Sequence, residues 1–405
     1  MSNYNYVYYT AQINNDASKS SSAFDNEEPN FEFKEDRKVP IITESDKYEM
    51  AVESAMFDLK TLPTFIPTIK FNMNPIDLQK IETIYEVTLE FDGMSSTVPI
   101  YFEPQDQTIT GPPNFDNGMA NYKSGYYNLY NYEFFFTMVN EAIRTTFLKL
   151  IDVIKSYFGG TLPTTFTNLA TNSVYEIPYF IFDKESSLIF LNSPKSTFSE
   201  SNTTHINIML NKSLYRLFNS LPFILQNKTF NSLKSDGITQ TTINQTLFKL
   251  NLSNFKQANE VEIYPHLSDG SSGSIKTTHM LIYQDYETLS SWSPVESIVL
   301  ISPNFPVPSH QMSSSLEYLD GIINQVGETR TEQEILEVKS NKPIPIVIYE
   351  PKQYRWMTLR QSDSDNLRQI IFKIFYRFKL NGDLIAVKAG VGGSFSCKLM
   401  FRKIR

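Results

Sequence analysis

The chain has 405 residues and a net charge of −8, with 41% apolar and 20% charged residues. This length and composition allow one large core or two moderate ones and exclude disorder as the general state. A single cysteine, Cys397, excludes an internal disulfide and a cysteine-based zinc site. No run approaches the roughly 20 apolar residues of a membrane helix, and no apolar segment follows a basic start. We therefore expect neither a membrane span nor a signal peptide.

Charge is distributed unevenly along the chain. Residues 1–60 carry 12 acidic and 6 basic side chains, whereas residues 339–405 carry 14 basic and 4 acidic side chains. Such asymmetry is typical of a protein with one end that faces a negative surface, either nucleic acid or the acidic part of a neighbouring subunit. A sheet face exposed only to water is the ordinary alternative.

The first 45 residues predict a flexible N-terminal arm, because a serine-rich stretch and acidic runs occur together there. The tyrosines near the start of this arm suggest that it docks on a partner as an extended segment.

From residue 46 onward, short runs of β-branched and aromatic residues alternate with turn residues such as Asp92-Gly93. This spacing is typical of β-sandwiches and not of alternating strand–helix units. We therefore predict a mostly β protein with a sandwich body over residues 46–405, and a second sandwich or an inserted domain around residues 115–260.

One amphipathic helix is predicted within residues 131–160, where Gly159-Gly160 ends the helical pattern. A second, short helix is expected within residues 212–222. The apolar stripe of the long helix consists of Phe136, Val139, Ile143, Phe147, Leu150 and Ile154. One apolar stripe of this kind predicts a helix that packs across a sheet.

Residues 368–405 alternate apolar and polar side chains and predict a hairpin followed by a third strand. Asn381-Gly382 supplies the two positive-φ positions of a type I′ turn. The alternation points Cys397 inward and places four cations on the opposite side. These cations are Lys373, Arg377, Lys398 and Arg402. We predict that the four lie together on one sheet face and contact a neighbouring subunit or nucleic acid.

No residue pattern indicates catalysis. The four histidines are scattered without a pair at metal-ligand spacing, and no phosphate-binding loop occurs. The acid pair Asp363 and Asp365 lies in a polar turn, which does not supply the desolvation that a general acid needs. The sequence predicts no enzyme activity, no catalytic residue, no metal and no cofactor.

Several blocks of the chain resemble the minor capsid (penton) proteins of virophages and polinton-like viruses. These blocks are "YYNLYNYEFFFTMVNEAI", "WSPVESIVLISPNFPVP", "IVIYEPKQYRWMTL" and "RQIIFKIFYRFKLNGDLIAV". The resemblance implies a jelly-roll β-sandwich, either one jelly roll with an inserted domain or two jelly rolls. It also implies a viral structural protein that forms the pentameric vertex, or penton, of an icosahedral double-stranded DNA virus.

The resemblance further implies two partners, which are other copies of the chain in a homopentamer and the major capsid protein. The basic C-terminal sheet face adds packaged DNA as a third candidate partner. The implied location is the virion, after assembly inside the infected host cell. Two alternatives stay open. One is a double jelly-roll major capsid protein, and the other is a host-attachment or carbohydrate-binding β-sandwich protein.

Overall fold

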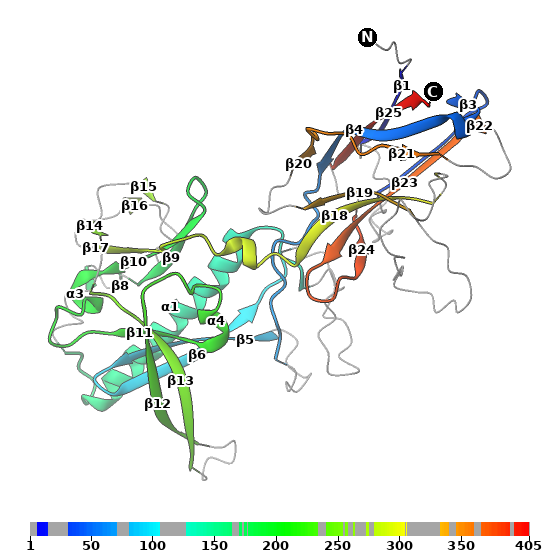
Figure 1. Ribbon diagram of the computed structural model, residues 1–405. Helices are drawn as coiled ribbons and strands as arrows, with labels where there is room; N and C mark the ends of the chain where they lie inside the picture. Colours follow the sequence, from blue (N-terminus) through cyan, green and yellow to red (C-terminus); the bar gives the residue numbers. More distant parts are fainter. Residues whose placement is uncertain are drawn as a thin grey trace. The chain divides into compact units, whose positions relative to one another are not determined.

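A computed structural model shows how these segments are arranged (Figure 1). The structure describes residues 6–14, 31–70, 81–105, 127–163, 170–171, 174–175, 177–233, 240–253, 256–257, 262–263, 273–274, 279–303, 305, 333–339, 346–359, 366–388 and 393–404. The chain divides into two compact units. We call Met1–Thr64 with Ser293–Arg405 the jelly-roll unit, and Phe65–Trp292 the inserted unit.

The jelly-roll unit contains two antiparallel sheets. The first has the order β1 (Tyr6–Asn14), β25 (Ser394–Lys403), β4 (Tyr48–Asp58) and β20 (Ile346–Tyr349). The second has the order β2 (Glu32–Asp36), β23 (Gln369–Phe378), β18 (Val295–Ser302) and β19 (Gln333–Lys339). Numbered along the chain, these eight strands read first, eighth, third and sixth in one sheet and second, seventh, fourth and fifth in the other. This is the strand order of a jelly roll.

Short elements complete the unit. They are β3 (Ile42–Thr43), which pairs with β22 (Asn366–Leu367), together with β21 (Met357–Thr358) on β4, β24 (Leu384–Ala386) on β23, and the 3-10 helix η2 (Ser45–Lys47). The predicted jelly-roll class is confirmed, and this unit contains one jelly roll.

Aromatic rings fill the space between the two sheets. Phe372 on β23 lies 6.3 Å from Phe395 on β25, measured between ring centroids, and both side chains are fully buried. Phe57 on β4 and Phe33 on β2 extend the cluster at 5.3 and 6.1 Å. Contacts between rings from opposite sheets show that the apolar faces pack against each other, as in a sandwich.

The N-terminal segment differs from the expected flexible arm. β1 pairs with β25 along its full length, from Tyr6 opposite Arg402 to Asn14 opposite Ser394, and β2 pairs with β23. Alternate residues of β1 face the core, and Ala11 is fully buried. Strand-forming tyrosines and this alternation outweigh the polar composition that suggested an arm. The serine-rich stretch lies outside the described residues.

The predicted hairpin and third strand form at the end of the chain, but they do not lie in one sheet. β23 and β24 pair with each other, but β25 joins the other sheet. Gly382 has a φ of +76°, whereas Asn381 is not among the described residues with positive φ, so the turn is not type I′. The type I′ geometry occurs instead at Asp92-Gly93, with φ values of 46° and 80°.

The inserted unit has two principal sheets. One has the order β12 (Phe223–Leu233), β13 (Gln240–Leu250), β11 (Asn207–Asn211), β5 (Ile81–Phe91) and β6 (Met94–Phe102). The other has the order β14 (Lys256–Gln257), β17 (His279–Tyr283), β10 (Leu188–Pro194) and β9 (Tyr179–Asp183). The remaining elements are α1 (Tyr132–Tyr157), α3 (Lys195–Phe198), α4 (Lys212–Tyr215), η4 (Leu289–Ser291), β7 (Ala170–Thr171), β8 (Val174–Tyr175), β15 (Glu262–Ile263) and β16 (Gly273–Ser274).

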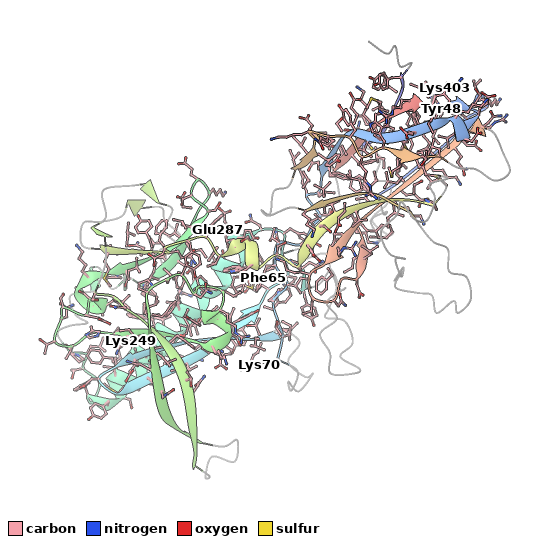
Figure 2. All side chains as sticks on the ribbon, in the orientation of Figure 1. Tyr48, Phe65, Lys70, Lys249, Glu287 and Lys403 are labelled. Carbon is pink, nitrogen blue, oxygen red and sulfur yellow. The ribbon has the colours of Figure 1, made fainter. Side chains whose placement is uncertain are left out.

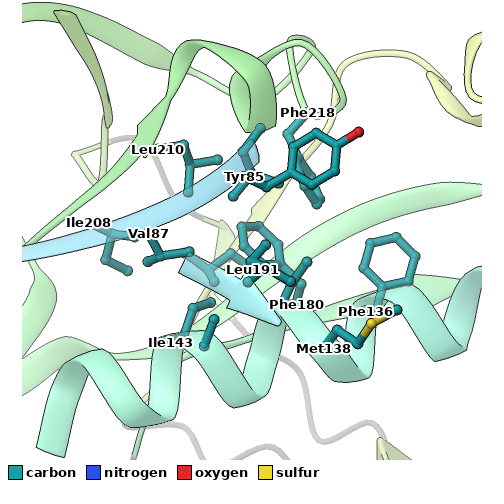
Figure 3. Packing of buried hydrophobic residues seen from close by; sticks show 14 of the residues in the cluster. Tyr85, Val87, Phe136, Met138, Ile143, Phe180, Leu191, Ile208, Leu210 and Phe218 are labelled. Carbon is teal, nitrogen blue, oxygen red and sulfur yellow. The ribbon is translucent and has the colours of Figure 1, made fainter. Parts of the chain in front are cut away.

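Helix α1 confirms the predicted amphipathic helix. The Asn131 side chain caps it by accepting a hydrogen bond from the Glu133 backbone N–H at 2.8 Å. Every residue of the predicted apolar stripe is buried, and the helix packs on β5, β6 and β9. Figure 3 shows Ile143 of this helix beside Val87 and Leu191 from the strands. The expected second helix is shorter than predicted, since α4 is a single turn.

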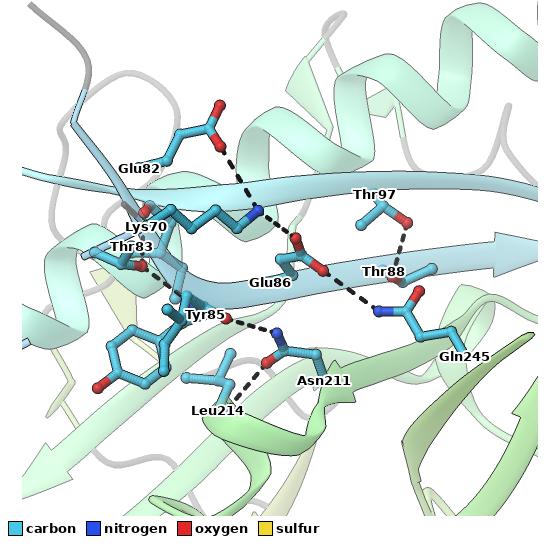
Figure 4. A network of polar contacts seen from close by, with 12 residues as sticks. Lys70, Glu82, Thr83, Tyr85, Glu86, Thr88, Thr97, Asn211, Leu214 and Gln245 are labelled. Atoms are coloured by element: carbon cyan, nitrogen blue, oxygen red, sulfur yellow. Dashed lines mark hydrogen bonds and ion pairs between the residues drawn. The ribbon is translucent and has the colours of Figure 1, made fainter. Parts of the chain in front are cut away.

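A polar network links the strands of the larger sheet (Figure 4). Lys70 Nζ lies 2.6 Å from Glu86 and 3.6 Å from Glu82, while Gln245 on β13 donates to Glu86 at 3.4 Å. Burial lowers the pKa of Lys70, but the hydrogen bond and charge of Glu86 outweigh burial and raise it overall. The network therefore holds a charged lysine against two carboxylates and stabilises the sheet.

The two ends of the inserted unit lie side by side. Phe65, its first residue, and Trp292, its last, have ring centroids 5.5 Å apart, and both rings are buried. The Trp292 indole N–H donates to the Leu217 carbonyl at 3.0 Å. The points where the chain enters and leaves the inserted unit are therefore both held by the core of that unit.

We expect Phe372→Ala to lower the free energy of unfolding by about 3–5 kcal/mol, because its buried ring contacts rings from both sheets. Urea denaturation of the purified protein measures this change. Leu380→Ala is the control, because Leu380 is 72% exposed, and it should change stability by less than about 0.5 kcal/mol. Equal losses for both variants would contradict the face-to-face packing of the sheets.

Candidate assembly interface

The structure places the four predicted cations on two different sheets. Lys373 and Arg377 lie on β23, whereas Lys398 and Arg402 lie on β25. Phe372 and Phe395 both point into the shared core, so the cations at alternate positions point outward from opposite faces of the sandwich. The expectation of one shared face is therefore wrong. Alternation fixes which way a side chain points within a strand, but not which sheet the strand joins.

Arg402 contacts both a carboxylate and an aromatic ring. Its Nη2 lies 2.7 Å from Glu49 Oε2, and its Nε donates to the same oxygen at 2.8 Å. The guanidinium carbon also lies 3.8 Å from the centroid of the Trp356 ring. A carboxylate and an aromatic face therefore hold this arginine in one orientation.

Lys398 repeats this arrangement on the same sheet. Its Nζ lies 2.8 Å from Glu53 Oε2 and 4.8 Å from the centroid of the Tyr8 ring. The hydrogen bond with Glu53 raises the pKa of Lys398 above its usual value. The outer face of the first sheet thus carries two units of carboxylate, cation and aromatic ring.

The second sheet carries a smaller polar group on its outer face. Arg377 Nε lies 3.3 Å from Glu337 Oε1, which also accepts a hydrogen bond from Ser297 at 2.6 Å. Burial raises the pKa of Glu337, but the hydrogen bond from Ser297 and the charge of Arg377 outweigh it and lower the pKa overall. Lys373 faces Glu32 in the register between β23 and β2.

Two of these pairings join the acidic and the basic parts of the sequence. Glu49 and Glu53, from the acidic first sixty residues, neutralise Arg402 and Lys398 near the basic C-terminus. Arg402, Lys398 and Arg377 are therefore each paired with a carboxylate of their own subunit. Such faces favour directional contacts with a protein over the diffuse attraction of a uniformly positive surface.

A junction between the sheets was missed by sequence reasoning. The Tyr9 hydroxyl on β1 donates to Glu35 on β2, and Arg37 Nε donates to Glu35 at 2.8 Å. These hydrogen bonds lower the pKa of Glu35, while burial is the main reason that the pKa of Tyr9 is raised. Only the alternation of apolar and polar residues in β1 could have indicated this contact. The serine-rich and acidic composition of the first 45 residues suggested a flexible arm instead.

Exposed aliphatic residues gather where β20 borders β4. Ile348 is 62% exposed and lies opposite Met56, which is 38% exposed, and Ile346 lies on the same face. Exposed neighbouring apolar residues of this kind mark contact surfaces. The sequence shows only a short apolar run here, and nothing in that run distinguishes a buried strand from an exposed edge.

The chemistry of the described residues is limited. Among them, no three His, Cys, Asp or Glu side chains gather as a metal site. Burial raises the pKa of Cys397 to about 12, which disfavours its reactive thiolate form. No helix in the described ranges is long and apolar enough to cross a membrane.

Comparisons with known proteins relate this architecture to virophage capsids. The family model of the Sputnik minor capsid protein V18/19 matches residues 7–403. The chain belongs to this family. As a V18/19 family member it is a minor capsid protein, a structural subunit of the virion that assembles with capsid proteins. No curated protein matches the chain.

Two solved structures share the fold of this V18/19 family member. A chain of the Sputnik virophage structure has a TM-score of 0.64 and 21% sequence identity, with 98% of each chain covered. The mavirus penton protein has a TM-score of 0.52 and 15% identity, with 99% of this chain and 100% of that chain covered. The alternative of a double jelly-roll major capsid protein is not supported, because the family is that of a minor capsid protein.

We expect Arg402→Gln to lower the free energy of unfolding by about 0.5–2 kcal/mol, since it removes a partly exposed ion pair and a stacking contact. A double-mutant cycle with Glu49→Gln, followed by urea denaturation, measures the coupling. Lys352→Gln, at an exposed position of the same unit, is the control. A coupling of zero would show that the contact between Arg402 and Glu49 adds nothing to stability.

Stability should fall in acid partly through Glu35. Its pKa is lowered in the folded protein, so its contribution is complete above the unfolded pKa of about 4.3 and is lost as the pH falls through the folded pKa. We expect Glu35→Gln to lose less stability than the wild type between about pH 6 and pH 3. Melting temperatures of the variant and the wild type across this pH range measure the difference, and Glu350→Gln, at an exposed position, is the control. Identical pH profiles for wild type and Glu35→Gln would contradict the proposed role.

Proposed function

We propose that five copies of this chain form a closed ring at the capsid vertex, bordered by the major capsid protein. One observation carries this proposal: the chain matches a protein described as a penton over nearly the full length of both chains. Membership of the minor capsid family is consistent with it. Assembly takes place inside the infected host cell, and the chain acts as a structural subunit without catalysis.

The four cations are proposed as contacts to neighbouring subunits. Lys373 and Arg377 lie on one outer face, and Lys398 and Arg402 lie on the opposite face. A ring requires two different surfaces that meet head to tail, and opposite faces of one sandwich supply such a pair of surfaces. This arrangement suits a ring better than the single shared face that the sequence suggested.

Contact between these cations and packaged DNA is the less favoured proposal. A phosphate would have to displace Glu49 from Arg402, or Glu53 from Lys398, before it gained a counterion. The exposed aliphatic patch beside β20 also suits a protein contact more than nucleic acid. The host-attachment alternative stays an untested prediction.

Mass photometry of the purified protein should give five times the subunit mass, and negative-stain images should show five-fold rings. We expect Arg377→Glu combined with Arg402→Glu to abolish the rings, because both opposite faces then carry reversed charge. Lys352→Glu is the control and should leave the rings intact. A monomer or a trimer for the wild-type protein would refute the ring. Intact rings in the double variant would refute the role of these cations only.

A further inference from the structure

The edges of the jelly-roll unit are protected against strand addition to very different degrees. Each sheet has two edges. In the first sheet one edge is β1, and the other is formed by β20 and the two-residue β21. In the second sheet one edge is β19, and the other is formed by β2 and the three-residue β24. Natural proteins protect edges with short strands, charged side chains or proline, because an unprotected edge pairs with other chains. An edge strand that lacks such protection is therefore a candidate site for strand addition.

Three of the four edges carry it. Strand β20 has four residues and lies between Pro345 and Pro351. Strand β2, with the sequence EFKED, has four charged residues out of five. Strand β19, with the sequence QEILEVK, carries two glutamates and a lysine. Each edge therefore has at least one feature that opposes pairing with another strand.

Strand β1 has none of these features. Its nine residues, YVYYTAQIN, contain no charged residue and no proline. In the described part of the chain β1 pairs only with β25, so its other edge carries no ladder of backbone hydrogen bonds. The outward side chains Tyr8, Thr10 and Gln12 are exposed and uncharged. A long and uncharged edge of this type is the usual template for an added strand.

The strand is firmly attached to its own subunit. Tyr9 is buried and its hydroxyl donates to Glu35 on the other sheet, while Lys398 lies over the ring of Tyr8. Ala11 is buried opposite Cys397. These contacts hold β1 in place, so its outer edge is presented as a fixed surface.

We infer that the outer edge of β1, from Val7 to Asn14, receives an extended strand from a different capsid protein in the assembled shell. The strand adds by backbone hydrogen bonds and extends the first sheet. Its side chains lie beside Tyr8, Thr10 and Gln12, an exposed row that carries no charge of its own.

A second copy of this chain is the less suitable source, and this step rests on the proposed ring. Among the described edges of the jelly-roll unit, the other three are protected, so only β1 of another copy could pair with β1. That pairing is two-fold, and it would use both edges within a dimer instead of propagating around a ring.

Hydrogen exchange on the intact protein tests the inference. In free rings, the amides of Val7–Asn14 that point away from β25 should exchange readily. In shells assembled with the major capsid protein, the same amides should slow by at least about tenfold, because each gains a hydrogen bond. Slow exchange already in the free ring, or unchanged exchange in the shell, would overturn the inference.

A pair of variants adds a second readout. Gln12→Lys places a charge on the edge, whereas Ser396→Lys places the same charge directly across from it on β25, one strand inward. We expect Gln12→Lys to reduce incorporation into shells by about tenfold while rings still form, and Ser396→Lys to incorporate normally. Equal incorporation of both variants would count against the inference.

The ring and the edge are judged separately. If the free protein is not a ring, the proposed pentamer is wrong. Strand addition at β1 is then still tested by whether the amides of Val7–Asn14 exchange slowly only in the shell. If rings form but Gln12→Lys destroys them, the edge is a contact between copies and the inference of a different protein is wrong.

Discussion

The antiparallel pairing of β25 with β1 and β4 is the interaction on which the jelly roll depends. β25 is the last strand of the chain, and both of its neighbours lie within the first 58 residues. Figure 2 labels Tyr48 and Lys403, which face each other at one end of this ladder. The sheet therefore closes only after the whole inserted unit has been synthesised, and its contacts are among the least local that the chain can make.

The same pairing explains the distribution of charge. An acidic beginning and a basic end suggest a protein that presents a positive surface to a partner. In the folded subunit the beginning and the end are adjacent strands, and Glu49 and Glu53 meet Arg402 and Lys398 across the sheet. The asymmetry thus helps to bring distant parts of the chain into register.

Local patterns predicted local structure well. The apolar stripe of α1 and the alternation of Phe372 and Phe395 identified buried side chains correctly, because period alone fixes which face is apolar. Sheet membership depends on contacts between distant segments, so the sequence could not show that β25 leaves the sheet of β23. The contact between Tyr9 and Glu35 was missed for the same reason, since each residue lies in a segment that looks like part of a flexible arm.

The neighbouring positions of Phe65 and Trp292 have a consequence for how such a chain could arise. Two ends that meet leave the host fold only a short gap to close, so an insertion between two strands costs the host little entropy whatever its length. The module between them is free to diverge or be exchanged for another, while the shell-forming scaffold keeps its eight strands. Variation among relatives should accordingly concentrate in the inserted module.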